Sequence, residues 1–278
     1  MFGNVPRACE WAGVCPFEAR FRFVEGPPNR PLTRKRRTAA DLRASWKEHA
    51  EAWVVWAREP SHDSYWRFHR DLFLASVPAA GRKTLDLGCG EGRLSRDLKA
   101  LGHDVVGVDI SPTMLEAAQH ADEQIETHLA DAAGLPFPDA AFDCVVAFMS
   151  LQDIDDLRGT TREVQRVLEP RGRFCLAIVH PLNSAGGFEG DAMDSPFVID
   201  GSYLEESFYE DNVVRDGLEM TFVSAHRPLH AYTDAINEAG LLIERLDEPA
   251  APEHAITRLQ SRRWQRVPLF LHLRAIRP

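Results

Sequence analysis

Three strand-like segments in the first half of the chain end in residues that suit a nucleoside ligand. Residues 85–92 read Leu-Asp-Leu-Gly-Cys-Gly-Glu-Gly, and glycines are needed where a strand turns sharply into a helix and a ligand approaches bare backbone. Asp109 ends the next strand, where an acid can accept hydrogen bonds from both ribose hydroxyls of an adenosine. Asp131 ends the strand after that. These residues predict a site for an adenosine-containing ligand.

Two other glycine-rich phosphate loops fit this stretch poorly. A dinucleotide fingerprint would place glycine at position 93, where the chain has Arg93. A Walker A loop would end in Gly-Lys-Ser/Thr, which is absent here. A glycine turn with an incidental acid downstream stays an alternative, but three successive strands that each end in a suitable polar residue argue against coincidence.

Three residues near the carboxyl ends of later strands are candidate general bases. His180 follows the fifth strand, Asp153 follows the fourth by a few residues, and His226 lies between a predicted hairpin and the next helix. Open α/β sheets bind ligands at these strand ends. Each residue also has a structural alternative, because His180 can order the segment that follows, His226 can anchor its helix, and Asp153 can start one.

Strands and helices alternate around these residues. The strands are expected at 84–87, 104–108, 125–130, 144–149, 174–179, 241–246 and 269–276. Several are continuous apolar runs, which is typical of central strands in a parallel sheet covered on both faces. Apolar stripes at helical spacing lie between them, so the pattern predicts a doubly wound α/β fold.

Further segments flank this core, and residues 38–278 are expected to form a single domain. Apolar stripes predict a helical cover over 38–80, ahead of the core at 82–181. Residues 182–227 read as an insertion or lid with a β-hairpin turning at Asp216-Gly217, and 228–278 complete the sheet.

Residues 1–37 are rich in Pro, Gly and Arg and are expected to be a disordered extension. Aromatic residues of the cover and insertion are expected to supply the substrate wall, with two or three of them in contact with a substrate and most of the others packed in the fold: Trp46, Trp53, Tyr65, Trp66, His69, Phe73, Phe188, Phe197, Tyr203, Phe208 and Tyr209.

The composition of the chain limits the classes of partner that the protein is expected to bind. The 278 residues carry a net charge of −10, and an acidic protein is poorly suited to bind nucleic acid, because phosphate contacts need Lys and Arg. The basic run at 34–37 reads as a solvated tail. No apolar run approaches membrane-spanning length, no secretory signal is evident, and no Cys-x-x-Cys pair suggests zinc or disulfides. We expect a cytoplasmic protein without a metal, and its oligomeric state stays open.

Residues 85–92 resemble motif I of the class I S-adenosylmethionine (SAM)-dependent methyltransferases, in their type-11 small-molecule branch. Residues 105–112 resemble the second motif, 131–137 the adenine-binding turn, 142–146 motif IV, and 168–173 the turn into the fifth strand. Arg171 stands where the family usually has glycine. The pattern and the resemblance together predict a Rossmann-like sheet of about seven strands, mostly parallel with an antiparallel last strand.

The resemblance implies a role for each matching residue. Gly88, Cys89 and Gly90 would present backbone to the methionine part of SAM, with Asp86 near its amino group and Asp109 on the ribose. The other implied contacts are Ile110 against adenine, Asp131 and the Ala132 backbone at the adenine edge, and Phe148 and Met149 beside the methionine end. Met114 either packs on adenine or is an ordinary core methionine.

The implied activity is methyl transfer from SAM to a small molecule, on oxygen, nitrogen or carbon. Alignment of the acceptor behind the methyl carbon would supply most of the catalysis, and a general base matters only for a hydroxyl or a protonated amine. Three alternatives stay open: a SAM-binding protein without enzymatic activity, a nicotinamide-dependent oxidoreductase, which Arg93 disfavours, and a nucleic-acid methyltransferase, which the acidic charge disfavours.

Overall fold

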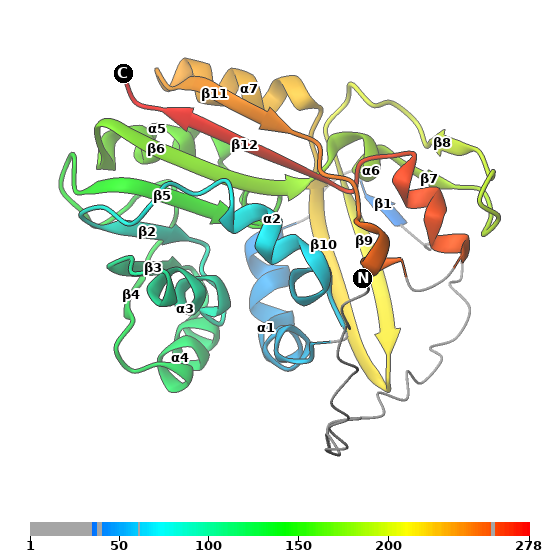
Figure 1. The fold of residues 1–278 in the computed structure, drawn as a ribbon, viewed down its shortest axis with the longest axis horizontal. Coiled ribbons are helices and arrows are strands. Elements are labelled where there is room, and N and C mark those ends of the chain that lie inside the picture. The colour runs from blue at the N-terminus through cyan, green and yellow to red at the C-terminus, as the bar shows by residue number, and fades with distance from the viewer. Residues whose placement is uncertain (1–34, 38–40, 61, 257–258) are drawn as a thin grey trace, which may run out of the picture.

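A seven-stranded sheet forms the centre of the computed structural model, which describes residues 35–37, 41–60, 62–256 and 259–278 (Figure 1). Its strand order is β11-β12-β6-β5-β2-β3-β4. The strands are β2 (Thr84–Leu87), β3 (Val105–Asp109), β4 (Glu126–Leu129), β5 (Phe142–Phe148), β6 (Leu168–Val179), β11 (Leu242–Asp247) and β12 (Phe270–Ile276). Only β12 runs antiparallel to its neighbours. The predicted Rossmann-like sheet with an antiparallel last strand is confirmed.

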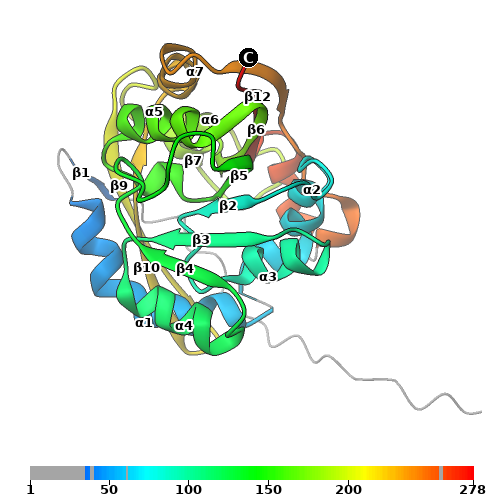
Figure 2. The same cartoon turned by 90° about the vertical axis from the view of Figure 1, so that its left-hand side faces the viewer.

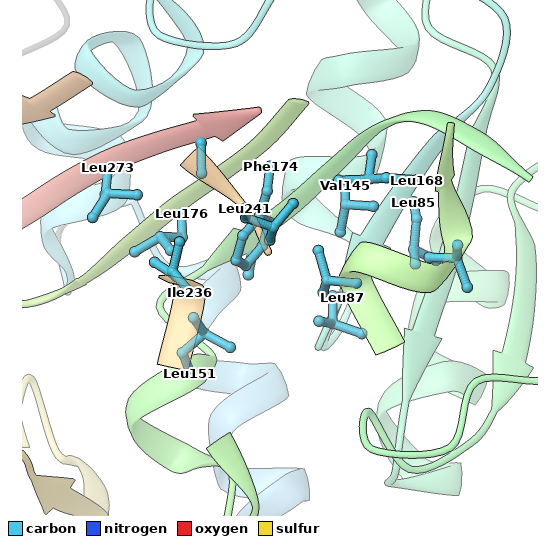
Figure 3. Close-up of a cluster of buried hydrophobic side chains, with 14 of the residues drawn as sticks. Leu85, Leu87, Val145, Leu151, Leu168, Phe174, Leu176, Ile236, Leu241 and Leu273 are labelled. Carbon is cyan, nitrogen blue, oxygen red and sulfur yellow. The ribbon is translucent and has the colours of Figure 1, made fainter. Parts of the chain in front are cut away.

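Helices cover both faces of this sheet because its central strands are apolar on both sides. In β5, Val145 and Ala147 face a core formed with α5 (Leu157–Val167) and α7 (Leu229–Glu238). Cys144, Val146 and Phe148 face the opposite core, which α3 (Arg93–Ala100) completes. Figure 3 shows the first of these cores, where Leu151 and Ile236 reach toward the strand residues. The remaining helix of this region, α4 (Pro112–Ala121), begins at the N-cap Ser111 with proline in its first turn.

The N-terminal cover is helical, as predicted. It consists of α1 (Leu42–Arg58), a five-residue π-helix (Tyr65–His69) and α2 (Arg70–Leu74). Helix α1 contacts both α4 and strand β10 (Leu218–His226). Figure 1 shows α1 between these elements, and Figure 2 shows it beside α4. No helix among the described residues combines the length and the apolar character needed to cross a bilayer.

The insertion contains the predicted hairpin, which is longer than expected. Strands β9 (Ser207–Arg215) and β10 pair along their whole length and turn at Asp216 and Gly217, which have φ values of 49° and 81°. Two positive φ values are the requirement of a type I′ turn. Residues 35–37, which the sequence placed in the extension, form strand β1 (Lys35–Arg37) and pair with β9. The rest of the expected extension lies outside the described residues.

Short elements complete the chain, and the sequence did not predict them. They are the helix α6 (Pro181–Ala185), the paired strands β7 (Gly186–Phe188) and β8 (Phe197–Ile199), and the 3-10 helices Leu151–Asp153, Glu253–Ala255 and Leu259–Gln265. Elements of three to seven residues carry too few periodic positions to be recognised from pattern alone.

Arg171 has a left-handed backbone, with φ of 68°. Such a conformation costs a residue with a side chain roughly 1–2 kcal/mol. We expect Arg171→Gly to raise the free energy of unfolding by up to about 1 kcal/mol, measured by urea denaturation. Arg173→Gly should have the opposite sign, because Arg173 has no positive φ and pairs with Glu244. A loss of stability in Arg171→Gly would contradict this explanation.

Candidate functional site

A cavity of about 440 Å³ opens at the carboxyl ends of the central strands. Helix α1, the hairpin β9–β10 and the segment after β5 supply the rest of its wall. The lining includes all eleven residues to which the resemblance gave a cofactor role: Asp86, Gly88, Cys89, Gly90, Asp109, Ile110, Met114, Asp131, Ala132, Phe148 and Met149. Residues from four strands and their loops therefore converge on one space.

The glycine bend after β2 is held by hydrogen bonds to the neighbouring strand. The N–H groups of Gly88 and Cys89 donate to the Val108 carbonyl over 2.8 and 3.0 Å. These two amides are therefore engaged within the protein, and the Cys89 carbonyl accepts a hydrogen bond from the N–H of Gly92 over 3.0 Å. The bend ends at Gly92, which caps α3 with a φ of 80°.

Gly88 has two reasons to be glycine. Its φ is 72°, and an added Cβ would lie 2.5 Å from the Cβ of Ser150. Ser150 is itself fixed, because its Oγ donates to the Leu87 carbonyl. We expect Gly88→Ala to lower the free energy of unfolding by about 1–3 kcal/mol and to displace the bend. Thermal unfolding measures the loss. Gly134→Ala is the matched control, since an added Cβ there meets nothing within 4 Å; equal stability of the two variants would contradict the expectation.

Asp109 accepts two backbone hydrogen bonds at the edge of the cavity. Its Oδ2 accepts from the N–H of Gly90 and its Oδ1 from the N–H of Ser111, both over 2.9 Å. Burial raises the pKa of this carboxyl, and the amides of Ser111, Gly90 and Ile110 oppose that rise. Each oxygen keeps a further lone pair for a ligand hydroxyl.

Asp86 is an enclosed acid of the lining, with 1% of its surface exposed. Ser95 Oγ donates to its Oδ2 over 2.6 Å. Burial raises the Asp86 pKa to about 7, with a further upward contribution from the Asp109 charge and an opposing one from Ser95. A ligand cation beside Asp86 would favour its charged form.

Asp131 is occupied by a partner that the sequence did not indicate. Arg43 of α1 forms an ion pair with its Oδ2, while its Oδ1 accepts from the N–H of Ala133 over 2.9 Å. Both charged side chains are about half exposed, so solvent weakens the pair. Helix α1 therefore reaches across the cavity to the end where the adenine was expected.

Met149 follows β5 with a φ of 58°, and its N–H donates to the Ala177 carbonyl over 2.7 Å. Left-handed backbone at a residue with a long side chain is a local strain of the kind found at functional sites. The chain leaves the sheet at this residue. Gln152 and Asp153 of the 3-10 helix that follows, at residues 151–153, line the cavity.

Of the three candidate bases, only Asp153 lines the cavity. His180 lies elsewhere, where its Nε2 contacts Glu248 over 2.7 Å and its Nδ1 accepts from the N–H of Leu182 over 3.0 Å. His226 is 1% exposed, and its two ring nitrogens contact Ser184 Oγ and the Tyr203 carbonyl. The structure therefore favours the structural alternative for both histidines: His180 caps α6 and His226 ties the insertion to the hairpin.

His180→Ala should reduce stability rather than turnover. The variant loses the cap of α6 and the contact with Glu248, and a lost cap costs about 1 kcal/mol. We expect a lower unfolding temperature with methyl transfer per folded molecule changed by less than a factor of about 3. His230→Ala, on the exposed face of α7, is the control. A large fall in turnover without a change in stability would contradict this expectation and indicate that His180 takes part in catalysis.

Asp153 stands among buried polar atoms that the protein leaves without hydrogen-bond partners. These atoms, in the described part of the chain, include Asp153 Oδ1, Gln152 Oε1 and Trp46 Nε1. Burial raises the Asp153 pKa to about 7, and Ser224, Trp46 and the Arg227 charge lower it in part. Unpartnered buried groups are costly, and the side chains of Ser224 and Trp46 lie close enough to lower the Asp153 pKa by hydrogen bonding.

Aromatic residues of the N-terminal cover and of the hairpin form part of the cavity wall. Of the eleven expected aromatic residues, the lining contains Trp46, Trp53, Tyr65 and Tyr209. The structure adds Phe222, whose ring lies 6.0 Å from that of Trp53, and Ser224. Both residues stand on β10, and their spacing of two in a strand was the one available signal that they share a face.

Comparison with known proteins agrees with this geometry. Residues 85–176 match the protein family described as Methyltransferase domain. This part of the chain is a class I methyltransferase domain. The resemblance read from the motifs is thereby confirmed. The match runs from β2 into β6, and it includes the glycine bend, Asp109, Asp131 and Asp153.

Individual relatives extend the comparison. The demethylmenaquinone methyltransferase of Tropheryma whipplei is 33% identical over 122 residues, which are 43% of this chain and 50% of the relative. The 27-O-demethylrifamycin SV methyltransferase of Amycolatopsis mediterranei is 37% identical over 121 residues, 41% of this chain and 44% of the relative. The chain thus spans about half the length of the curated relatives it matches. An S-adenosylmethionine-dependent methyltransferase structure from Mesorhizobium loti is 27% identical with a TM-score of 0.64, covering 78% of this chain and all of the other.

Proposed function

We propose that this protein transfers a methyl group from SAM to a small-molecule acceptor in the cavity. The observation that carries the proposal is the convergence of the glycine bend, Asp109 and Asp131 on one space within a methyltransferase domain. Relatives whose names describe methylation of a quinone precursor and of a rifamycin support an acceptor of small-molecule size. The acidic net charge of −10 supports a small molecule over nucleic acid.

The donor groups of the cavity fit SAM. Gly90 has a φ of 56°, and an added Cβ there would lie 3.6 Å from Trp53 Nε1, so a ligand can approach its bare backbone. Asp109 would hold the ribose and Asp86 the methionine amino group, since both carboxylates line the same space. Met114, 3% exposed, would pack against the adenine with Ile110. At Asp131, the Arg43 pair leaves the adenine only part of the carboxylate.

SAM supplies, when bound, a methyl carbon on a sulfonium, whose bond to sulfur breaks with both electrons remaining on the sulfur. The protein's part is to align the acceptor and to exclude water. Helix α1 and the hairpin cover the cavity for this purpose, and the Arg43 contact with Asp131 is the point at which α1 must move aside. Such cover segments commonly control entry and release.

Asp153 is the residue we assign as the proton acceptor. Its Oδ1 is buried at the cavity wall, and the side chains of Ser224 and Trp46 lie close to the carboxylate. With a pKa raised to about 7 it can be deprotonated at neutral pH and still take up a proton during turnover. His180 and His226 would then support the fold around it.

The proposal includes a cytoplasmic protein without a metal requirement. Cys89, Cys144 and Cys175 are buried and unlinked, as expected for a reducing compartment. A nicotinamide-dependent oxidoreductase is disfavoured further, because Arg93, which stands where the dinucleotide fingerprint has glycine, forms an ion pair with Asp63. Its guanidinium also lies over the rings of Trp53 and Tyr65.

Incubation of the protein and a cell extract with methyl-labelled SAM tests the function, followed by mass identification of labelled small molecules. We expect label in one small acceptor with wild-type protein and little with Asp109→Ala. Binding of SAM without any transfer of label, across extracts and purified acceptors, would instead favour a non-enzymatic SAM-binding protein.

A further inference from the structure

Helix α1 packs on the hairpin, and the two together form one wall of the cavity. Leu42, at the start of α1, is fully buried and packs with Val223 and Ala225 of β10. Farther along the helix, the ring of Trp53 meets that of Phe222 edge to face at 6.0 Å. Apolar contacts thus join the helix to the hairpin. Another part of the wall comes from the glycine bend and the ends of β3 and β4.

Arginines at the two ends of α1 connect this helix to the cofactor side of the cavity. At the C-terminal end, Arg58 contacts Glu91 of the glycine bend over 3.3 Å and donates to the Ala117 carbonyl of α4 over 2.9 Å. At the N-terminal end, Arg43 pairs with Asp131, which follows β4. Both acids line the cavity, so α1 is attached across it at two points.

The two attachments differ in their exposure to solvent. The Glu91 side chain is 1% exposed, and Arg96 of α3 also donates to both of its carboxylate oxygens, over 3.0 and 2.8 Å. The Arg43 and Asp131 side chains are 54% and 43% exposed. Exposed ion pairs are weak and are screened by salt, whereas buried charges are screened much less. The attachment at Asp131 is therefore the one that separates first.

Arg43 stands at the adenine end of the cavity. It belongs to the lining, together with Ile110 and Ala132 of the expected adenine site. Its partner atom is Asp131 Oδ2, while Asp131 Oδ1 accepts from the N–H of Ala133 over 2.9 Å. An adenine amine that approached Asp131 Oδ2 would therefore meet the guanidinium there.

We propose that the Arg43–Asp131 ion pair is a latch that holds the cavity closed until the cofactor binds. The inference rests on the proposed function, with Asp131 as a hydrogen-bond acceptor for the adenine amine. When the pair separates, α1 and the hairpin move away from the end of β4 while the Arg58 attachment holds, and the nucleoside enters. The adenine then replaces Arg43 at Asp131. The latch competes with the cofactor, so its loss should strengthen cofactor binding.

Stopped-flow binding of S-adenosylhomocysteine to the full chain tests the latch, with tryptophan fluorescence as the signal because Trp46 and Trp53 line the cavity. At low salt we expect Arg43→Ala to bind about two- to fivefold faster and more tightly than the wild type, which is the range that an exposed ion pair supplies. Lys47→Ala is the matched control. It removes a cation from an exposed position of the same helix and should bind as the wild type does.

Salt gives a second readout, which a merely structural role of Arg43 would not produce. S-adenosylhomocysteine is a zwitterion without net charge, so its diffusional encounter depends little on ionic strength. Screening weakens the latch, and the wild-type association rate should therefore rise about two- to fivefold from low salt to roughly 0.5 M sodium chloride. This rise should be absent in Arg43→Ala. Asp131→Asn keeps an oxygen for the adenine amine but loses the charge that holds Arg43, so adding Arg43→Ala to it should bring no further acceleration.

Three results would overturn the latch. They are slower, weaker or unchanged binding in Arg43→Ala, a wild-type association rate that does not rise with salt, and equal acceleration in Lys47→Ala. In each case the binding of S-adenosylhomocysteine itself leaves the proposed function standing. Absence of binding in the wild type would instead remove the proposed function, and the latch with it.

Discussion

Asp109→Ala is expected to weaken SAM binding at least tenfold while the protein stays folded. The wild-type carboxylate is half-buried, accepts hydrogen bonds from the amides of Gly90 and Ser111, and lines the cavity. A hydrogen bond to a charged group contributes about 1.5–3 kcal/mol, and the ribose offers two hydroxyls. Calorimetric titration with SAM measures the loss directly.

Two further variants separate the loss of ribose contacts from damage to the bend. Asp109→Asn retains one side-chain oxygen, so its affinity should fall between those of the wild type and Asp109→Ala. Asp104→Ala removes an exposed acid five residues earlier and should bind SAM normally. Unchanged affinity in Asp109→Ala, with an unchanged unfolding temperature, would refute the ribose assignment.

Asp153→Asn is expected to lower turnover by a factor of about 100 or more, in line with the effect of a general base. The wild-type rate at subsaturating acceptor should rise with pH through about 7, because the Asp153 carboxyl must lose its proton before it can accept one. The charged and titratable groups facing it are Arg227 and, from α7, Tyr232. Tyr232 titrates near 12, and arginine keeps its charge. Neither produces a rise near 7, whereas Asp86 of the same cavity, whose pKa burial also raises to about 7, would produce one in the wild type and in Asp153→Asn alike.

The pH profile separates a proton-transfer role for Asp153 from a structural one. In Asp153→Asn the rise near pH 7 should disappear together with most of the rate, whereas SAM affinity should change little. Asp234→Asn, on the exposed face of α7, should retain both rate and profile. A variant that loses rate but keeps the wild-type rise would show that another group accepts the proton.

The cofactor half of the site could be read from the sequence because its signals are local. Gly88 and Asp109 each sit at the end of a strand whose apolar run is visible on its own, and parallel strand ends gather at one edge of a sheet. The same reasoning placed the hairpin turn at Asp216-Gly217. Each of these features depends on a few consecutive residues.

The acceptor half depends on contacts between residues far apart in the chain. Arg43 reaches Asp131 across 88 positions, and His180 meets Glu248 across 68. Neither pairing produces a periodic pattern in the sequence. The sequence therefore could not show that Asp131 pairs with Arg43, or that His180 contacts Glu248 outside the cavity. Phe222 and Ser224 join the wall only because the hairpin folds against α1.

Calorimetric titration of the wild-type protein with S-adenosylhomocysteine, and separately with NADH, tests the central claim most directly. The geometry predicts saturable one-to-one binding of S-adenosylhomocysteine and no measurable heat with NADH. Saturable binding of NADH with none of S-adenosylhomocysteine would show that the glycine bend and its two carboxylates serve a different nucleotide.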